Sequence, residues 1–284
     1  MGHENAPPLL LDRLSDPLIS SVWNVLLARL VFVYRPDGFR VEPKVSPLVG
    51  RLAVGYYSFP ADELPDAWEE RRDWFKKRFR EECAGNWYRL YDTVSFIAEE
   101  WERLPTVGEY SDFETAINKV FVQENAGYRL VSRRVEPITG AAEIESITDA
   151  LAATQAVGLD LVRTQLDTAL SKLAIRPIPD YRNCIKEAIS AVEAVSSVLA
   201  GKTKPDLPKA LAVLEGRMKL HHQFKAAVSN LYRYASDEDG VRHGMMADPN
   251  VGLAEAKFVL VACSAIVHFL ILKAQEHGML ETMN

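Results

Sequence analysis

The sequence predicts a mainly α-helical protein, in which a helical N-terminal region with a small β-hairpin precedes an antiparallel four-helix bundle. Three observations indicate this fold class. Apolar residues recur at three- and four-residue spacing through most of the chain. Glycines follow several of these segments, as they do at helix ends, and only residues 127–140 alternate apolar with polar positions as strands do. With 284 residues, 48% of them hydrophobic, the chain can bury a sizeable core in one large or two medium domains.

The N-terminal region begins with a helix over residues 16–34, for which Asp16 is the expected N-cap and Pro17 the first helical residue. Residues 35–60 are dense in Pro and Gly and predict a loop with at most short extended pieces. Three more helices are expected, over residues 66–85, 86–104 and 111–125. The charges of the first of these alternate in sign and favour a solvated salt-bridge face over a nucleic-acid patch.

Two local features complete this region. Ser111, with Glu114 three residues later, predicts a capping box at the start of the third of these helices. The alternating segment 127–140 predicts a hairpin near 128–138 with about four residues per strand. Within it, Tyr128 is expected to be structural and Arg129 to lie on the surface.

The helical period resumes at residues 140–175, with a break near Gly158, and a proline pair in residues 176–183 marks the expected domain boundary. The predicted domains are therefore 1–175 and 176–284. The second holds the four helices of the bundle, expected at residues 180–201, 204–216, 218–236 and 252–278. The uncharged run at 258–272 is shorter than the roughly 18 to 20 residues that a bilayer demands, so it predicts a core helix.

Composition limits the function. A formal net charge of −6 argues against broad electrostatic adhesion to nucleic acid or to an anionic membrane, so any RNA contact has to be local. Cys83, Cys184 and Cys263 have no C-x-x-C spacing and are expected to be buried thiols in a reducing compartment. The N-terminus lacks the features of an export signal. We therefore expect a cytoplasmic protein with no membrane partner, no metal and no cofactor.

Catalytic motifs narrow the chemistry further. The chain has no Gly-rich phosphate loop, no G-x-S-x-G, no H-E-x-x-H and no Cys/His cluster, which leaves arginine and histidine. Metal-independent RNA cleavage needs a group that moves protons near neutral pH and a cation that stabilises the pentacovalent phosphorane. The stretch "SDEDGVRHGMM" at 236–246 offers Arg242 beside His243, and "RMKLHH" offers Arg217 and His222.

These residues bring a family resemblance into view. A four-helix unit with Arg and His near the start of its last helix resembles the HEPN superfamily, whose usual signature is Arg, four to six residues, then His. The blocks "LLDRLSDPLISSVWNVL", "INKVFVQENAGYRLVSRRVEPITGAAEIESI", "DYRNCIKEAISAVEAV" and "LYRYASDEDGVRHG…AEAKFVLVACSA" resemble proteins with an AbiJ-type abortive-infection N-terminal domain. The resemblance covers most of the chain, except the loop at 36–60. It implies a HEPN-like fold, a dimer, and a role in phage defence or growth arrest.

The site that the resemblance implies departs from the superfamily pattern. Arg242 and His243 are adjacent and lack the spacer, whereas Arg217 and His222 satisfy it but stand at the start of the third bundle helix. We expect His243 to act as general acid/base and Arg242 to stabilise the phosphate. The alternative is that Arg242 pairs with a neighbouring carboxylate, such as Asp239, and fixes the start of the last helix.

Further residues are expected to support this site. The amides at Arg182 and Asn183 would help to bind an anion at a helix N-terminus, although helix capping is the simpler explanation for both. Glu187 and Glu193, if they face inward, would seek Arg242 as their cationic partner. The supporting set is thus Glu187, Glu193, Arg182, Asn183 and Asp239.

Three functions remain open on the sequence. The first is a metal-independent endoribonuclease that acts as an anti-phage or toxin effector on RNA. The second is a catalytically inactive HEPN-like module that binds RNA, a nucleotide or a defence-system partner protein. The third is a structural subunit whose helices mediate assembly. A homodimer is expected.

Overall fold

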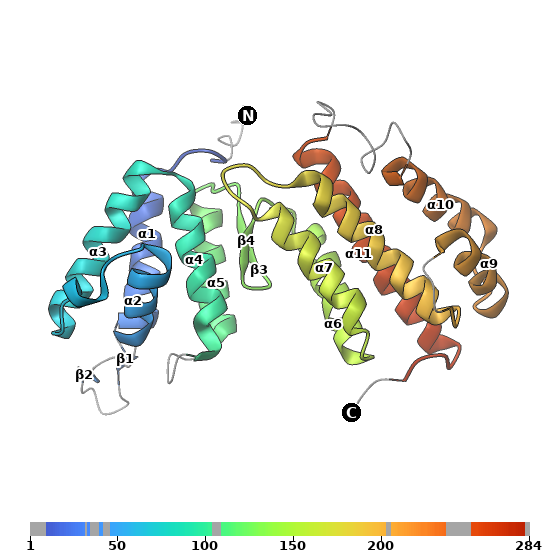
Figure 1. Ribbon diagram of the computed structural model, residues 1–284, viewed down its shortest axis with the longest axis horizontal. Helices are drawn as coiled ribbons and strands as arrows, with labels where there is room; N and C mark the ends of the chain where they lie inside the picture. The colour runs from blue at the N-terminus through green and yellow to red at the C-terminus, as the bar shows by residue number, and fades with distance from the viewer. Residues whose placement is uncertain are drawn as a thin grey trace, which may run out of the picture. The chain divides into compact units, whose positions relative to one another are not determined.

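The computed structural model describes residues 10–31, 33–34, 40–41, 46–103, 109–202, 206–236 and 251–281 (Figure 1). It is mainly helical and contains a small antiparallel hairpin, as the sequence predicts. Contacts divide the chain into two compact units, Met1–Thr139 and Gly140–Asn284.

The first unit contains helices and four short strands. Its elements in chain order are α1 (Asp16–Leu26), the π-helical turn η1 (Leu27–Val31), β1 (Val33–Tyr34), β2 (Arg40–Val41), α2 (Ser46–Arg51), the π-helical turn η2 (Leu52–Tyr56), the 3-10 turn η3 (Ala61–Glu63), α3 (Trp68–Gly85), α4 (Tyr88–Glu100), the 3-10 turn η4 (Trp101–Arg103), α5 (Tyr110–Gln123), β3 (Arg129–Val131) and β4 (Arg134–Glu136).

Aromatic side chains from several helices fill the core of this unit. Trp23 of α1 packs edge-on against Phe75 of α3, with ring centroids 5.4 Å apart. Trp101 stacks on Phe113 of α5 at 4.5 Å. All four rings belong to one hydrophobic cluster, and each buries a large apolar area that water would otherwise cover.

Helix starts and one loop differ from the sequence prediction. Residues 46–56 are helical rather than loop, because Leu48 and Leu52 are fully buried. Ser15, rather than Asp16, is the N-cap of α1, and its hydroxyl oxygen accepts a hydrogen bond from the backbone amide of Leu18. Ser111 lies inside the first turn of α5, whose N-cap makes no side-chain bond, so the predicted capping box is wrong.

The β3–β4 hairpin confirms the predicted one, with three residues per strand. Its two turn residues, Ser132 and Arg133, have φ of 48° and 70°, as a type I′ turn requires. The Asn118 side chain of α5 holds β3 by two 2.8 Å hydrogen bonds, accepting the amide of Leu130 and donating to its carbonyl. Arg129 is buried, which corrects the expected surface position, and donates to the carbonyls of two neighbouring residues.

The second unit is entirely helical in its described residues. Its elements are α6 (Ala141–Ala156), α7 (Asp160–Leu173), α8 (Tyr181–Leu199), α9 (Leu207–Arg217), α10 (His222–Ser236) and α11 (Leu253–Glu276). The break near Gly158 is confirmed, since its φ of 68° ends α6.

Packing in this unit differs from the predicted bundle of the last four helices. α8 packs mainly on α7 and α11, and α6 also packs on α11, so α6 and α7 share the core with α8 and α11. α9 packs on α8, and α10 contacts α9 and α8. The predicted antiparallel bundle of α8 to α11 is therefore not confirmed. The boundary expected at 175/176 falls between the closely packed α7 and α8 of one compact unit, and the domain ranges stay a prediction.

Side-chain contacts show the relative direction of α6 and α11. Lys257 pairs with Glu143 at 3.0 Å, and the Ser146 hydroxyl donates to the carbonyl of Val261. Glu143 precedes Ser146 in α6, and their partners Lys257 and Val261 follow in the same order in α11, so the two helices run in the same direction. In Figure 1, α8 and α11 also begin at the same end of this unit.

α11 contains the uncharged run 258–272. By length and composition it is the one helix among the described residues that could cross a membrane. It nevertheless serves as a core helix of its unit, because residues at helical spacing along it are buried, among them Val259, Leu260, Cys263, Val267 and Ile271.

Candidate functional site

The two residues expected to do the chemistry, Arg242 and His243, lie outside the described residues, as does Asp239. They belong to the segment 237–250, which joins the end of α10 to the start of α11 in the sequence. Their roles stay a prediction. The structure does describe four of the residues expected to support them, namely Arg182, Asn183, Glu187 and Glu193.

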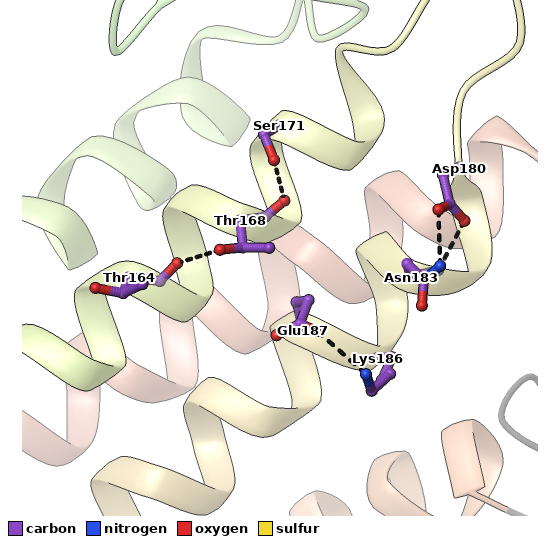
Figure 2. Close-up of polar contacts among 7 residues, drawn as sticks. All are labelled: Thr164, Thr168, Ser171, Asp180, Asn183, Lys186 and Glu187. Carbon is purple, nitrogen blue, oxygen red and sulfur yellow. Dashed lines mark hydrogen bonds and ion pairs between the residues drawn. The ribbon is translucent and has the colours of Figure 1, made fainter.

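The start of α8 holds the first two of these residues. Asp180 is the N-cap of α8, and its carboxylate accepts both the backbone amide of Asn183, at 3.2 Å, and the Asn183 side-chain amide, at 2.7 Å (Figure 2). Both groups of Asn183 that could donate to an anion are therefore bonded to Asp180. Helix capping accounts for Asn183, as the simpler sequence interpretation proposed.

Arg182 differs from its neighbour. Its side chain is half-buried, and its Nη2 atom is buried without a hydrogen-bond partner among the described residues. Burial also raises the pKa of the adjacent Tyr181 above its usual range. A buried guanidinium nitrogen without a partner costs free energy, so Arg182 is the described cation in this part of the molecule that most needs an anionic or carbonyl ligand.

Glu187 and Glu193 do not converge on one point. Glu187 is half-buried and pairs with Lys186 at 3.3 Å (Figure 2). Glu193 is also half-buried and has no ion pair within the described part of the chain. Six residues separate them, which is about 9 Å along the axis and about 240° around it. A single arginine therefore could not bridge both carboxylates, and their expected partner Arg242 lies outside the described residues.

A strip of hydroxyl groups on α7, which the sequence analysis missed, lies near this part of α8 in Figure 2. Thr164, Thr168 and Ser171 follow helical spacing, and each hydroxyl donates to a carbonyl one turn earlier, at 2.7 to 2.8 Å. Their protons are thus engaged by the helix backbone. The strip can accept hydrogen bonds, but its hydroxyls are not arranged as activated nucleophiles.

The alternative pair, Arg217 and His222, has structural contacts. Arg217 ends α9 and donates to the carbonyl of Leu199, at the C-terminal end of α8, over 3.5 Å. His222 begins α10, and its ring stacks on His221 with centroids 4.4 Å apart. A cation beside the last carbonyls of a helix is a common stabilising arrangement. These contacts favour a role for Arg217 in holding α8.

The cysteines and the candidate metal ligands offer no further site among the described residues. Within the described ranges there is no group of three or more His, Cys, Asp or Glu residues that could hold a metal. Cys83, Cys184 and Cys263 are free and buried, which confirms the expectation of buried thiols. Burial raises the pKa of Cys83 to about 12, and it raises that of Cys263 as well. Both therefore stay as unreactive thiols at neutral pH.

Comparison with known proteins identifies the family. Residues 5–153 match the family AbiJ N-terminal domain 4, which covers the first compact unit almost completely and ends inside α6. The chain belongs to this family, which makes it a defence-related protein of the abortive-infection type. No curated protein and no solved structure matches the chain.

Proposed function

We propose that this protein is a HEPN-like, metal-independent endoribonuclease that acts as an abortive-infection effector in the cytoplasm. The supporting observation is the buried Nη2 atom of Arg182, which has no hydrogen-bond partner among the described residues. Arg182 stands at the start of α8, and α8 and α11 begin at the same end of this unit (Figure 1). The segment 237–250, which carries Arg242 and His243, is joined directly to that start. An RNA phosphate at this end would give Arg182 a charged ligand.

The proposed chemistry divides two tasks between neighbouring residues. His243 takes the proton of a ribose 2′-hydroxyl, whose oxygen then attacks the adjacent phosphorus. Arg242 stabilises the charge of the pentacovalent phosphorane, with Arg182 as a second cation. The bond from phosphorus to the 5′-oxygen breaks, and protonated His243 returns the proton to that oxygen as it leaves. The products are a 2′,3′-cyclic phosphate and a 5′-hydroxyl.

A homodimer is part of this proposal, as in the superfamily that the sequence resembles. Two copies of the segment 237–250 across one two-fold axis would form a composite groove for RNA. The partners proposed are therefore RNA, a second copy of the chain and a defence-system partner protein.

The alternative is a catalytically inactive HEPN-like module that binds RNA, a nucleotide or a partner protein. It is favoured by the adjacency of Arg242 and His243, which lack the usual spacer. The capping bonds of Asn183 also favour it, because they account for this residue by helix capping.

Expression of wild type, His243→Ala and His222→Ala distinguishes the nuclease from the inactive binding module. We expect wild type and His222→Ala to arrest growth and to cleave RNA in the presence of EDTA. His243→Ala should lose about 10² to 10⁴-fold in cleavage rate, as expected on removal of a general acid/base. Equal toxicity and cleavage by His243→Ala, or cleavage only after addition of magnesium, would contradict the nuclease proposal. RNA binding without cleavage by all three would support the inactive module.

A further inference from the structure

The first compact unit contains a cleft that the proposed nuclease site does not use. It lies between the start of α1 and the end of α3 and has a volume of about 560 Å³. Ligand pockets commonly measure about 300 to 1,000 Å³. The lining combines apolar side chains with Asp16, Ser20, Arg80, Cys83 and Trp87. The cleft is thus large enough for a small organic molecule and has polar groups to orient it.

Arg80 is the cation of this cleft, and its contacts differ from those of the other arginines of α3. Three arginines on this helix pair with carboxylates, namely Arg71 with Asp66, Arg72 with Asp73 and Arg78 with Glu82. Arg80 is exposed and makes no ion pair or hydrogen bond with any described residue. Its guanidinium therefore remains available to an anionic ligand, which it can bind with two parallel hydrogen bonds.

Asp16 and Ser20 add two further groups on α1. Neither side chain has a polar partner among the residues that the structure describes, and Asp16 does not pair with Arg80. Asp16 also lies in the first turn of α1, where a carboxylate favours the helix. The cleft therefore presents an acceptor for hydroxyl or amino donors on the side opposite to α3.

Trp87 supplies a flat apolar surface. Its ring is half-buried and packs against those of Tyr88, Tyr91 and Tyr128, with centroids 5.9, 6.1 and 5.9 Å apart. These contacts fix the position of the indole. A fixed, partly exposed indole in a cleft is suited to stacking against a planar ring. The buried thiol of Cys83 beside it is neutral at physiological pH and contributes an apolar wall.

We propose that this cleft binds a 5′-mononucleotide. The phosphate pairs with Arg80, the base stacks on Trp87, and a ribose hydroxyl or base amino group donates to Asp16. One cation faces one carboxylate here, which suits a single small anion with hydrogen-bond donors better than a polyanionic RNA strand. The site belongs to the first compact unit, so the proposal is independent of the nuclease chemistry proposed for residues 242 and 243.

Calorimetric titration of the full chain with AMP, GMP, CMP and UMP tests the proposal. We expect one-to-one binding of at least one nucleotide. Arg80→Gln should weaken it at least about tenfold, because a hydrogen bond to a charged group is lost. Trp87→Leu should weaken it by about tenfold or more through loss of stacking, whereas Trp87→Phe keeps a ring and should retain most of the affinity.

Lys76→Gln is the matched control. Lys76 is an exposed cation one turn earlier on α3 and does not line the cleft, so its removal should leave binding unchanged. His243→Ala should also bind normally, which separates this site from the nuclease proposal. Absence of binding by all four nucleotides, equal binding by Arg80→Gln, or equal weakening by Lys76→Gln would overturn the proposal. Affinity for inorganic phosphate equal to that for every nucleotide would overturn the role of Trp87.

Discussion

Gly127 and Leu10 are hydrogen-bonded across a short parallel bridge, in which the Gly127 amide donates to the Leu10 carbonyl at 2.8 Å. A Cβ atom on Gly127 would lie 2.4 Å from Cδ2 of Leu11 and 3.0 Å from that carbonyl oxygen. A side chain on Gly127 would therefore displace the exposed Leu11 side chain and press on the Leu10 carbonyl oxygen, which is backbone and moves less easily. This contact explains the glycine of the "GYRLV" stretch, since its φ is not in the left-handed region.

Substitution of Gly127 by alanine is expected to destabilise the first unit by about 1 to 3 kcal/mol, the usual effect of overpacking. Urea unfolding followed by tryptophan fluorescence measures the change. Gly50→Ala is the control, because Gly50 lies in α2 with nothing within 4 Å of its Cβ position. It should be neutral or stabilising by up to about 1 kcal/mol. Equal stability of the two variants would show that residues 10 and 11 are not held against Gly127.

Asn118 is expected to be the main side-chain support of the hairpin. Asn118→Ala removes two 2.8 Å hydrogen bonds and leaves both backbone groups of Leu130 without partners. The loss should be about 1 to 3 kcal/mol for each group that stays buried. Asn86→Ala, at an exposed asparagine, should stay within about 0.5 kcal/mol of wild type in the same unfolding assay. Similar small effects from both variants would contradict this role.

The sequence predicts the periodic parts of the fold and misses features that depend on tertiary contacts. Helical spacing located α3, α8 and α11 because buried residues recur at three- or four-residue intervals along each of them. The helix at residues 46–56 was missed because its Pro and Gly suggest a loop, whereas burial of Leu48 and Leu52 stabilises it. Arg129 was placed on the surface because local pattern says nothing about the carbonyls that accept its hydrogen bonds.

Helix partners and the candidate site were harder to predict for a similar reason. An amphipathic pattern shows that a helix buries one face, but it does not say against which helix. The sequence prediction therefore packed α8 and α11 against α9 and α10, whereas α6 and α7 provide much of that core. At the site, the sequence identified both Arg182 and Asn183 as candidates. Only the structure shows that Asn183 donates to the N-cap Asp180, whereas the Nη2 atom of Arg182 has no partner among the described residues.

Stability is expected to fall at high pH. Burial raises the pKa of Cys83 from 9.0 to about 12 and that of Tyr56 from 10.0 to about 12. The folded state therefore keeps protons that the unfolded chain releases, so the contribution is complete below pH 9 and is lost as the pH rises from about 9 to about 12. The midpoint of thermal unfolding should drop between pH 8 and pH 10.5. Cys83→Ala should show a smaller drop, and a midpoint that rises with pH would contradict the assignment.

Arg217 is expected to act on stability rather than on RNA cleavage. Arg217→Gln removes the hydrogen bond to the Leu199 carbonyl, a partly exposed contact whose loss should cost about 0.5 to 1.5 kcal/mol. Growth arrest and RNA cleavage should stay at wild-type levels if residues 242 and 243 form the site. Lys219→Gln, which removes an exposed cation two residues away, controls for the change in charge. Loss of cleavage in Arg217→Gln with an unchanged melting temperature would instead assign the nuclease site to Arg217 and His222, because a purely structural arginine cannot act without a change in stability.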